Sequence, residues 1–256
     1  MSKQVCDAVI CSVKQLNEKY FSLAIQPILK WDNISAGQFI QVAIPNSTTV
    51  FLRRPISVHD VDEQYQTIHL LIQKVGKGTE ALSILKPNDL INIVYPLGKG
   101  FSLLPAGKKA LLVGGGCGMA PLLYLAKKLY EQQVSSDILI GVKQKKDLIE
   151  REKYIQYGNV YVTTEDGSEG EKGLVTHHSI MNKLSRYDMI YTCGPEIMMK
   201  VVSHKAHQAG VSCEVSLENT MACGIGACLC CVTKTVQGHQ CVCTEGPVFN
   251  SNELLW

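Results

Sequence analysis

The feature that most constrains this chain is a dense run of cysteines in its C-terminal part. Six of the 11 cysteines fall between residues 223 and 243, within the segment 221–249, MACGIGACLCCVTKTVQGHQCVCTEGPVF. Cys223, Cys228 and Cys231 have the spacing C-x4-C-x2-C, which is typical of plant-type [2Fe–2S] proteins. The small residues between them favour a tight loop whose backbone N–H groups point at the cluster sulfurs. The spacing therefore predicts a [2Fe–2S] site.

Other uses of these cysteines fit the spacing less well. Zinc sites usually have paired C-x2-C knuckles, and only Cys228 and Cys231 are so spaced. A disulfide framework needs an oxidising compartment, and buried inert cysteines seldom cluster so densely. Cys230 is surplus, because choosing it gives C-x4-C-x1-C. The fourth ligand stays open between Cys241 and Cys243, since both point to one side of an extended strand.

Composition excludes few classes of protein but gives expectations about partners and cellular location. The chain has 256 residues, 46% of them hydrophobic, and a net charge of +2 without a block of like charges, so we expect no nucleic-acid partner. The most apolar window, 110–126, contains four glycines and a proline, so we expect a strand, turn and helix and no membrane span. We see no signal peptide, and many cysteines without one indicate a reducing, cytoplasmic setting.

The N-terminal hundred residues have the pattern of a closed antiparallel barrel. Short runs rich in Val and Ile are separated by turns with Pro, Gly, Asn or Asp. A short helix is expected at 78–85, ending before Pro87. The predicted strands are residues 7–13, 21–25, 39–44, 56–60, 67–74 and 90–94.

Two segments of this barrel carry candidate chemistry. In residues 53–57, RRPIS, arginine suits a pyrophosphate, and a serine hydroxyl or backbone N–H can bond the edge of a flavin ring. Residues 76–79, GKGT, form a glycine turn before a helix, which favours anion binding. Taken alone, the first segment is explained better by a solvated arginine pair beside an edge strand, and the second by an N-cap threonine after a flexible turn. Because both segments occur together and precede a nucleotide-binding pattern, we expect them to bind a flavin cofactor.

Residues after about 106 alternate strands and helices, which predicts a doubly wound α/β unit with a parallel sheet. Its loops at 114–118, 164–167 and 193–196 follow strands, where such sheets bind ligands. The predicted strands are 109–113, 138–142, 160–164 and 189–193, and the predicted helices are 120–132 and 196–209.

The loops of this α/β unit favour a dinucleotide. Met119 occupies the last glycine position of G-x-G-x-x-G, so the full dinucleotide-binding motif is absent. A glycine-rich strand-to-helix turn remains, which lets a phosphate approach the backbone N–H groups. The alternative explanation of these glycines is tight packing of the strand against the helix. Glu165 and Asp166 suit ribose hydroxyls, and no arginine in their loop could pair with a 2′-phosphate, which predicts NAD over NADP. Cys117 and Cys193 are either buried hydrophobes or part of the nicotinamide site.

The order of these motifs resembles the ferredoxin–NADP reductase superfamily over essentially the whole chain. The C-terminal segment, with MACGIGAC and a last cysteine before GPVF, resembles the electron-transfer subunits of B-type dihydroorotate dehydrogenases. The resemblance implies an FAD-binding β-barrel (1–103), an NAD-binding α/β domain (104–210) and a [2Fe–2S] module (211–256). It departs from the family at Asn219-Thr220, where relatives often carry a basic residue, and at the extra thiols Cys230 and Cys241.

The resemblance also implies site residues. The cluster ligands are Cys223, Cys228, Cys231 and Cys243, the last because relatives place this ligand three residues before GPVF. The expected FAD-binding residues are Arg54, Pro55, Ile56, Ser57, Leu71, Ile72, Gln73, Gly78 and Thr79. The expected NAD-binding residues are Gly114, Gly115, Gly116, Glu165, Asp166, Cys193, Gly194 and Pro195.

The resemblance implies electron transfer in pyrimidine biosynthesis. Electrons would pass from the FMN of a dihydroorotate dehydrogenase catalytic subunit through the cluster and FAD to NAD, in a heterotetramer of two of each chain. No residue here looks like a base for dihydroorotate, so we assign no catalytic residue. The alternatives are a related subunit serving a sulfide dehydrogenase or transhydrogenase, and a non-enzymatic redox sensor.

A docking surface for the partner is expected around the cluster. Met221, Ile225 and Leu229 form an almost uncharged apolar rim between residues 220 and 233. One or two of them could instead pack on the α/β domain.

Overall fold

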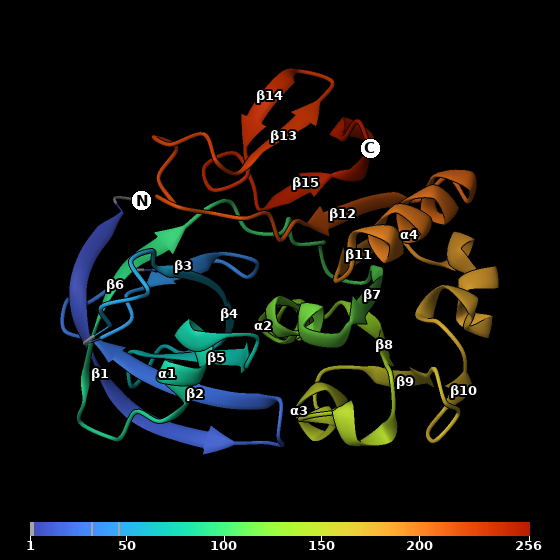
Figure 1. The fold of residues 1–256 in the computed structure, drawn as a ribbon. Coiled ribbons are helices and arrows are strands. Elements are labelled where there is room, and N and C mark those ends of the chain that lie inside the picture. Colours follow the sequence, from blue (N-terminus) through green and yellow to red (C-terminus); the bar gives the residue numbers. More distant parts are fainter. Residues whose placement is uncertain (1–2, 32, 46) are drawn as a thin grey trace.

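The structure is a computed structural model that describes residues 3–31, 33–45 and 47–256. Its N-terminal strands close into an antiparallel barrel in the order β1-β2-β5-β4-β3-β6 (Figure 1). Buried and exposed residues alternate along much of β1, as expected of strands with one face on a core. All six predicted barrel strands are present. Their bounds are β1 Gln4–Gln15, β2 Tyr20–Pro27, β3 Phe39–Val42, β4 Arg54–Asp62, β5 Thr67–Gln73 and β6 Leu90–Leu97, with helix α1 at Lys77–Ser83.

The second unit is a sheet in the order β10-β9-β8-β7-β11-β12-β15, parallel except for β15. Its central strands are buried almost throughout because helices cover both faces. The predicted strands and helices of this unit are confirmed. The strands are β7 Lys109–Gly115, β8 Ser135–Val142, β9 Asn159–Thr164, β10 Glu171–Lys172, β11 Met189–Cys193, β12 Ser212–Ser216 and β15 Val248–Asn250, and the helices are α2 Ala120–Glu131, α3 Arg151–Ile155 and α4 Glu196–Gln208.

Helix α2 joins the two units, lying between the barrel and the sheet (Figure 1). It is buried nearly all round, and one continuous apolar core contains barrel, α2 and sheet residues. Polar contacts reinforce the junction. The buried His59 of β4 lies 2.8 Å from the Ala120 carbonyl oxygen and 2.9 Å from the Glu150 carboxylate, and Lys127 pairs with Asp60 at 3.0 Å. The barrel and the sheet are therefore held in a fixed relation.

The C-terminal segment differs in part from the predicted third module. The division at residue 211 cuts through the α/β sheet, because β12 pairs with β11 and β15 pairs with β12. The hairpin of β13 (Val232–Thr235) and β14 (Gly238–Cys241) forms a separate two-stranded sheet, and it stands outside the seven-stranded sheet together with the loops on either side of it and the last residues of the chain. The buried Cys231, Val242 and Cys243 share an apolar core with the sheet. The cysteine segment is thus anchored on the nucleotide-binding unit.

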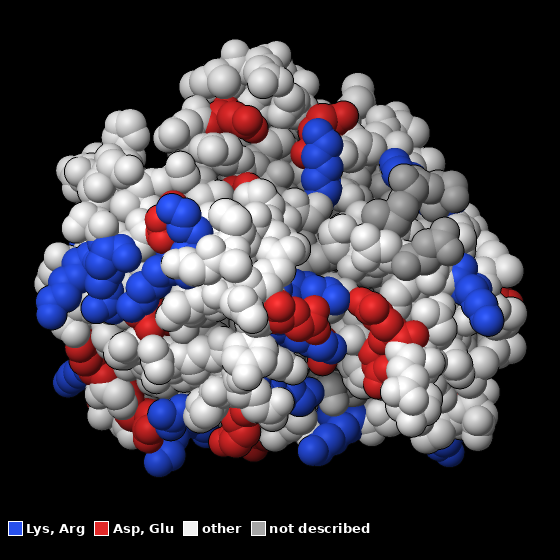
Figure 2. Space-filling view, turned by 180° about the vertical axis from the view of Figure 1, so that it is seen from behind, with Lys and Arg blue, Asp and Glu red and all other residues white. Residues whose placement is uncertain are grey.

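The remaining features are short or lie on the surface. Short 3₁₀ helices are found at Gly116–Met119, Lys145–Asp147, Val175–His177, Ser179–Asn182, Leu184–Arg186 and Ser251–Glu253. Charged residues of both signs are interspersed on the face shown in Figure 2. Within the described residues, every helix is too short or too polar to cross a membrane.

Candidate functional site: two cavities and a cysteine loop

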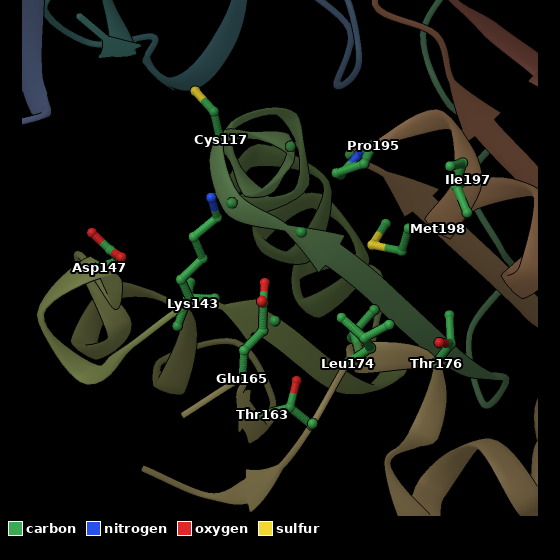
Figure 3. Close-up of a pocket in the computed structure, with 18 of the residues that line it drawn as sticks. Cys117, Lys143, Asp147, Thr163, Glu165, Leu174, Thr176, Pro195, Ile197 and Met198 are labelled. Atoms are coloured by element: carbon green, nitrogen blue, oxygen red, sulfur yellow. The ribbon is translucent and has the colours of Figure 1, made fainter. Parts of the chain in front are cut away.

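A cavity of about 820 Å³ opens at the carboxyl ends of the parallel strands. The glycine loop after β7 and the loop after β11 form one side, and residues after β8 and β9 form the other (Figure 3). Lys143 and Glu165 point into this space, and the Cys117 thiol points away from them toward the barrel (Figure 3). The position matches the ligand site expected of an open α/β sheet.

Most residues predicted to bind NAD line this cavity. Gly115, Gly116, Glu165, Gly194 and Pro195 all do. The remaining three predicted residues have other surroundings in the structure.

Those three residues support the cavity from outside it. Gly114 packs on the 3₁₀ helix before α2 and on the start of α2, where a methyl group at this position would lie 2.0 Å from the Met119 sulfur and 3.1 Å from Leu122. Asp166 turns to Ser168 and accepts hydrogen bonds from its amide (2.9 Å) and hydroxyl (2.6 Å). Cys193 is fully buried behind the loop that it begins. Their predicted roles in binding NAD stay predictions.

Gly118 closes the floor of the cavity. A methyl group there would lie 2.4 Å from the carbonyl oxygen of Cys193, so the loop after β7 approaches the loop after β11 only with glycine at this position. Tight strand–helix packing and ligand access, which were alternatives for the glycine loop, are therefore both present.

A second cavity, of about 300 Å³, lies on the barrel against the sheet. Its wall is mostly apolar, and Arg54 supplies a cation on one side. The predicted residues Arg54, Pro55, Ile56, Ser57, Leu71, Ile72, Gln73 and Thr79 all line it. An apolar cleft with one arginine fits a flavin ring joined to a pyrophosphate.

The two neighbouring arginines have different surroundings. Arg53 donates to the Asn92 carbonyl oxygen at 2.9 Å and also bonds the Asn92 side chain, which holds it on β6. Arg54 donates to the Leu52 carbonyl oxygen at 3.0 Å and faces the cavity. Arg54 is therefore the arginine available to an anion.

The predicted turn at 76–79 contributes mainly through its shape. The Thr79 hydroxyl accepts from the Val75 amide at 2.9 Å and donates to the Gly76 carbonyl oxygen at 3.1 Å, so it stabilises its own turn. Gly78 makes room for Arg54, because a methyl group there would lie 2.7 Å from the arginine Nε. The turn positions the guanidinium of Arg54 beside the cavity.

The two cavities meet at Gln73, Cys117 and Glu218, which line both. Protein surrounds the Glu218 carboxyl on most sides, while the side chain itself faces the open cavities. Burial raises the pKa of this carboxyl, and the Cys193 thiol, 3.7 Å away, lowers it only in part. Glu218 was not found from the sequence, although it stands just before the cysteine segment.

The cysteine loop has the N–H···S contacts expected of a cluster site. The amides of Ile225 and Cys228 each donate to the Cys223 sulfur at 3.4 Å, and the Gly226 amide donates to the Cys243 sulfur at 3.2 Å. Although burial raises it, donation from Ile225 and Cys228 lowers the pKa of the Cys223 thiol to about 6. The thiolate, which is the form that binds iron, is therefore favoured at Cys223, whereas burial and the neighbouring Cys231 thiol raise the pKa of Cys243 to about 12.

Interactions link the thiols of this segment. Cys223 interacts with Cys228, and Cys231 interacts with both Cys243 and Cys241, so the second pair is Cys231 with one of these two. Within the described residues, no three His, Cys, Asp or Glu side chains are grouped closely enough for a single metal ion. Two thiol pairs fit a [2Fe–2S] cluster, in which each of the two irons takes two protein ligands.

Cys243 and Cys241 are separated by a turn that the sequence did not reveal. Strand β14 ends at Cys241, and the amides of Thr244 and Glu245 donate back to its carbonyl oxygen at 3.0 and 2.9 Å. Strand alternation therefore does not apply to both. Cys243 is fully buried under the Gly226 amide, whereas Cys241 is partly exposed and Cys230 is exposed. These surroundings favour Cys243 as the fourth ligand.

One of the three predicted rim residues packs inward, the alternative expected for one or two of them, and the other two are exposed. Met221 is only 7% exposed and lines the barrel cavity, which brings the cysteine loop against that cavity. Ile225 and Leu229 are exposed by 48% and 64%. The exposed part of the rim is therefore formed by Ile225 and Leu229.

Comparison with known proteins finds relatives that share one name. The chain is 44% identical over 224 residues to the dihydroorotate dehydrogenase B (NAD(+)) electron transfer subunit of Caldanaerobacter subterraneus subsp. tengcongensis, covering 86% of this chain and 87% of that one. It is 34% identical over 251 residues to the subunit of the same name from Bacillus caldolyticus, covering 96% of both chains. Two family models match: the iron-sulfur cluster binding domain of dihydroorotate dehydrogenase B over residues 218–255, and the oxidoreductase NAD-binding domain over residues 112–204.

Solved structures agree with the fold. An NADH-dependent reduced ferredoxin–NADP oxidoreductase, studied for flavin-based electron bifurcation, has a TM-score of 0.87 and 31% identity, covering 97% of this chain and 90% of that one. A ferredoxin NADP+ reductase from Neisseria gonorrhoeae with bound FAD and NADP has a TM-score of 0.64 and 20% identity, covering 80% of this chain and 92% of that one. The second supports the fold alone.

Proposed function

Because this chain belongs to the family of dihydroorotate dehydrogenase B electron transfer subunits, we propose that it carries electrons between a dihydroorotate-oxidising partner and NAD. Electrons pass from the FMN of the catalytic subunit through a [2Fe–2S] cluster and FAD to NAD, in pyrimidine biosynthesis. The observation that carries this proposal is that the two cavities and the cysteine loop adjoin one another. The barrel cavity shares Gln73, Cys117 and Glu218 with the NAD cavity, and it meets the cysteine loop at Met221.

The residues of this chain bind, orient and shield the cofactors. Bound FAD supplies the exchange between one-electron cluster chemistry and two-electron nicotinamide chemistry. Arg54 would provide the cation for a pyrophosphate, and Gly118 lets the loops after β7 and β11 approach each other beside the cavity that would hold NAD. The Gly226 amide and the amides around Cys223 hold thiolates in place for iron.

The site assignments and the functional division are part of the proposal. We propose Cys223, Cys228, Cys231 and Cys243 as the ligands, and residues 1–103, 104–210 and 211–256 as the FAD, NAD and cluster regions. Strands β12 and β15 of the third region complete the sheet of the second. We also propose a cytoplasmic location. Its support is that the eleven described cysteines form no disulfide with one another, which suits a reducing compartment.

We predict a preference for NADH over NADPH of about tenfold or more in catalytic efficiency with an artificial electron acceptor. Glu165 faces the cavity, where its carboxylate suits ribose hydroxyls and repels a 2′-phosphate. Glu165→Gln should reduce the preference. Asp166→Asn is the matched control and should retain it, since Asp166 is engaged by Ser168. Equal efficiency of wild-type protein with both nucleotides contradicts this prediction.

The partner is the FMN-containing catalytic subunit, and the assembly is a heterotetramer of two of each chain. We predict that Ile225→Glu or Leu229→Glu lowers dihydroorotate-dependent NAD reduction about tenfold at limiting partner concentration, because a buried unpaired charge is costly. Flavin content, cluster content and dye-linked NADH oxidation should stay unchanged.

A matched control exists for this docking experiment. Ile155, at the end of α3, is 53% exposed, close to the 48% of Ile225, but lies at the opposite end of the molecule from the C-terminal hairpin (Figure 1). Ile155→Glu should leave coupled turnover intact. Unchanged co-purification and turnover in both rim variants would place the docking surface elsewhere.

A second candidate function has one specific observation in its favour. The solved ferredoxin–NADP oxidoreductase at 31% identity covers nearly the whole chain, so a subunit serving a transhydrogenase-type partner is the alternative. The test is to combine the purified chain with a dihydroorotate dehydrogenase catalytic subunit and to follow NAD reduction. Turnover that depends on dihydroorotate and on both chains supports the first function.

A further inference from the structure

One buried side chain lacks the hydrogen bonds that its chemistry requires. Gln41, in the middle of β3, is fully buried, and in the described part of the chain neither its Nε2 nor its Oε1 has a hydrogen-bond partner. Leaving a buried amide unpaired costs about 1–3 kcal/mol. By contrast, the Gln38 amide donates to the Gly98 carbonyl oxygen and accepts from the Ser35 amide, both at 2.8 Å. The Gln41 amide is therefore a free donor that calls for a partner.

The Gln41 amide lies against the cysteine loop. A methyl group on Gly224, the residue after Cys223, would be 2.7 Å from Gln41 Cγ and 2.9 Å from its Nε2. Gly224 also has φ +71°, a backbone conformation that side chains disfavour. Glycine at 224 thus allows the loop that begins with Cys223 to rest directly on Gln41.

Gln41 also has a defined relation to the barrel cavity. It lies two residues after Phe39, so both side chains leave the same face of β3, and Phe39 lines that cavity. Gln41 itself is not among the lining residues. Its position is between the flavin cavity and the cysteine loop.

We propose that the Gln41 Nε2–H group donates a hydrogen bond to a sulfur of the [2Fe–2S] cluster and sets its reduction potential relative to FAD. The inference rests on the proposed cluster at Cys223, Cys228, Cys231 and Cys243. An N–H donor stabilises the reduced, more negative cluster, so it raises the potential. Gln41 is in this way a barrel residue that tunes the electron step between cluster and flavin.

The test is a redox titration of the purified flavin- and cluster-containing protein, with the cluster followed by EPR and FAD by absorbance. Gln41→Met keeps the length of the side chain and removes the donor. Cluster content should stay at the wild-type level. The equilibrium between oxidised and reduced cluster should shift about tenfold toward the oxidised form, about 59 mV for one electron, while the FAD potentials stay unchanged. Ser136→Ala is the matched control, since its buried hydroxyl also lacks a partner within the described residues but lies on β8, three strands from β12.

Two results overturn the inference. The first is an unchanged cluster potential in Gln41→Met, and the second is a shift in the FAD potentials alone, which would make flavin the partner of the amide. If the variant does not fold, pulsed EPR of reduced wild-type protein labelled with ¹⁵N in glutamine side chains replaces it, and absence of ¹⁵N coupling to the cluster is the contradicting result. Dihydroorotate-linked turnover by the wild-type protein separates these failures from failure of the proposed function.

Discussion

Cys243→Ser is expected to remove the [2Fe–2S] cluster, and the same loss is expected for Cys223→Ser, Cys228→Ser and Cys231→Ser. Each variant leaves one iron with a missing thiolate, and a serine hydroxyl is a far poorer ligand at neutral pH. Wild-type protein should carry about two irons and two sulfides per chain, and each variant about a tenth of that or less. Iron and sulfide analysis with visible absorption spectroscopy provides the measurement.

The two surplus thiols supply the controls. Cys230→Ser and Cys241→Ser should retain the full cluster, because Cys230 does not fit the C-x4-C-x2-C spacing and Cys241 lies before the turn that buries Cys243. The Cys243 sulfur also accepts from the Gly226 amide. A cluster that survives Cys243→Ser and disappears in Cys241→Ser would exchange the assignments of these two residues.

Arg54→Ala is expected to weaken FAD binding about 10- to 100-fold. Its guanidinium supplies a cation beside the barrel cavity, and a charge-assisted hydrogen bond to a buried anion contributes about 1.5–3 kcal/mol. Purified Arg54→Ala should therefore lose flavin on gel filtration, and its dissociation constant can be measured by titration with FAD.

Arg53→Ala is the matched control for the flavin experiment. Arg53 is held by Asn92 on β6 and does not line the cavity, so its removal should leave FAD affinity near the wild-type value. If Arg53→Ala releases FAD and Arg54→Ala does not, the anion is bound beside Arg53 and not in the barrel cavity. Extraction of FMN in place of FAD from wild-type protein would contradict the assignment of the cavity itself.

The elements of the fold could be predicted because local patterns and tertiary structure agree for most of them. The continuous apolar runs at 109–113 and 189–193 became buried central strands, as two-sided coverage by helices requires. Strand β12 was missed as a member of the sheet. Its pairing with β11 is known only from the three-dimensional structure. Because β12 lies close to the cysteines in the sequence, it was assigned to the cluster module.

Some site residues could be predicted from the sequence and others could not, for physical reasons. Cysteine spacing carries ligand geometry directly, so the loop of Cys223, Cys228 and Cys231 was found from the sequence. Glu218 and Gln41 were missed because their surroundings come from elements far apart in the chain. Asp166 and Glu165 are neighbours with the same charge, and only the hydrogen bonds to Ser168 distinguish them. Sequence identifies the chemistry available, while packing decides which side chain faces a ligand.

The most direct test of the central claim is reconstituted electron transfer. The purified chain, with FAD and cluster content verified, is combined with the FMN-containing dihydroorotate dehydrogenase catalytic subunit of the same organism, and NADH formation from dihydroorotate is followed. NADH should form only when both chains are present, and its formation should be lost when Cys243→Ser replaces the wild-type chain. NADH formation by the partner alone, or none when both chains carry all their cofactors, would contradict it.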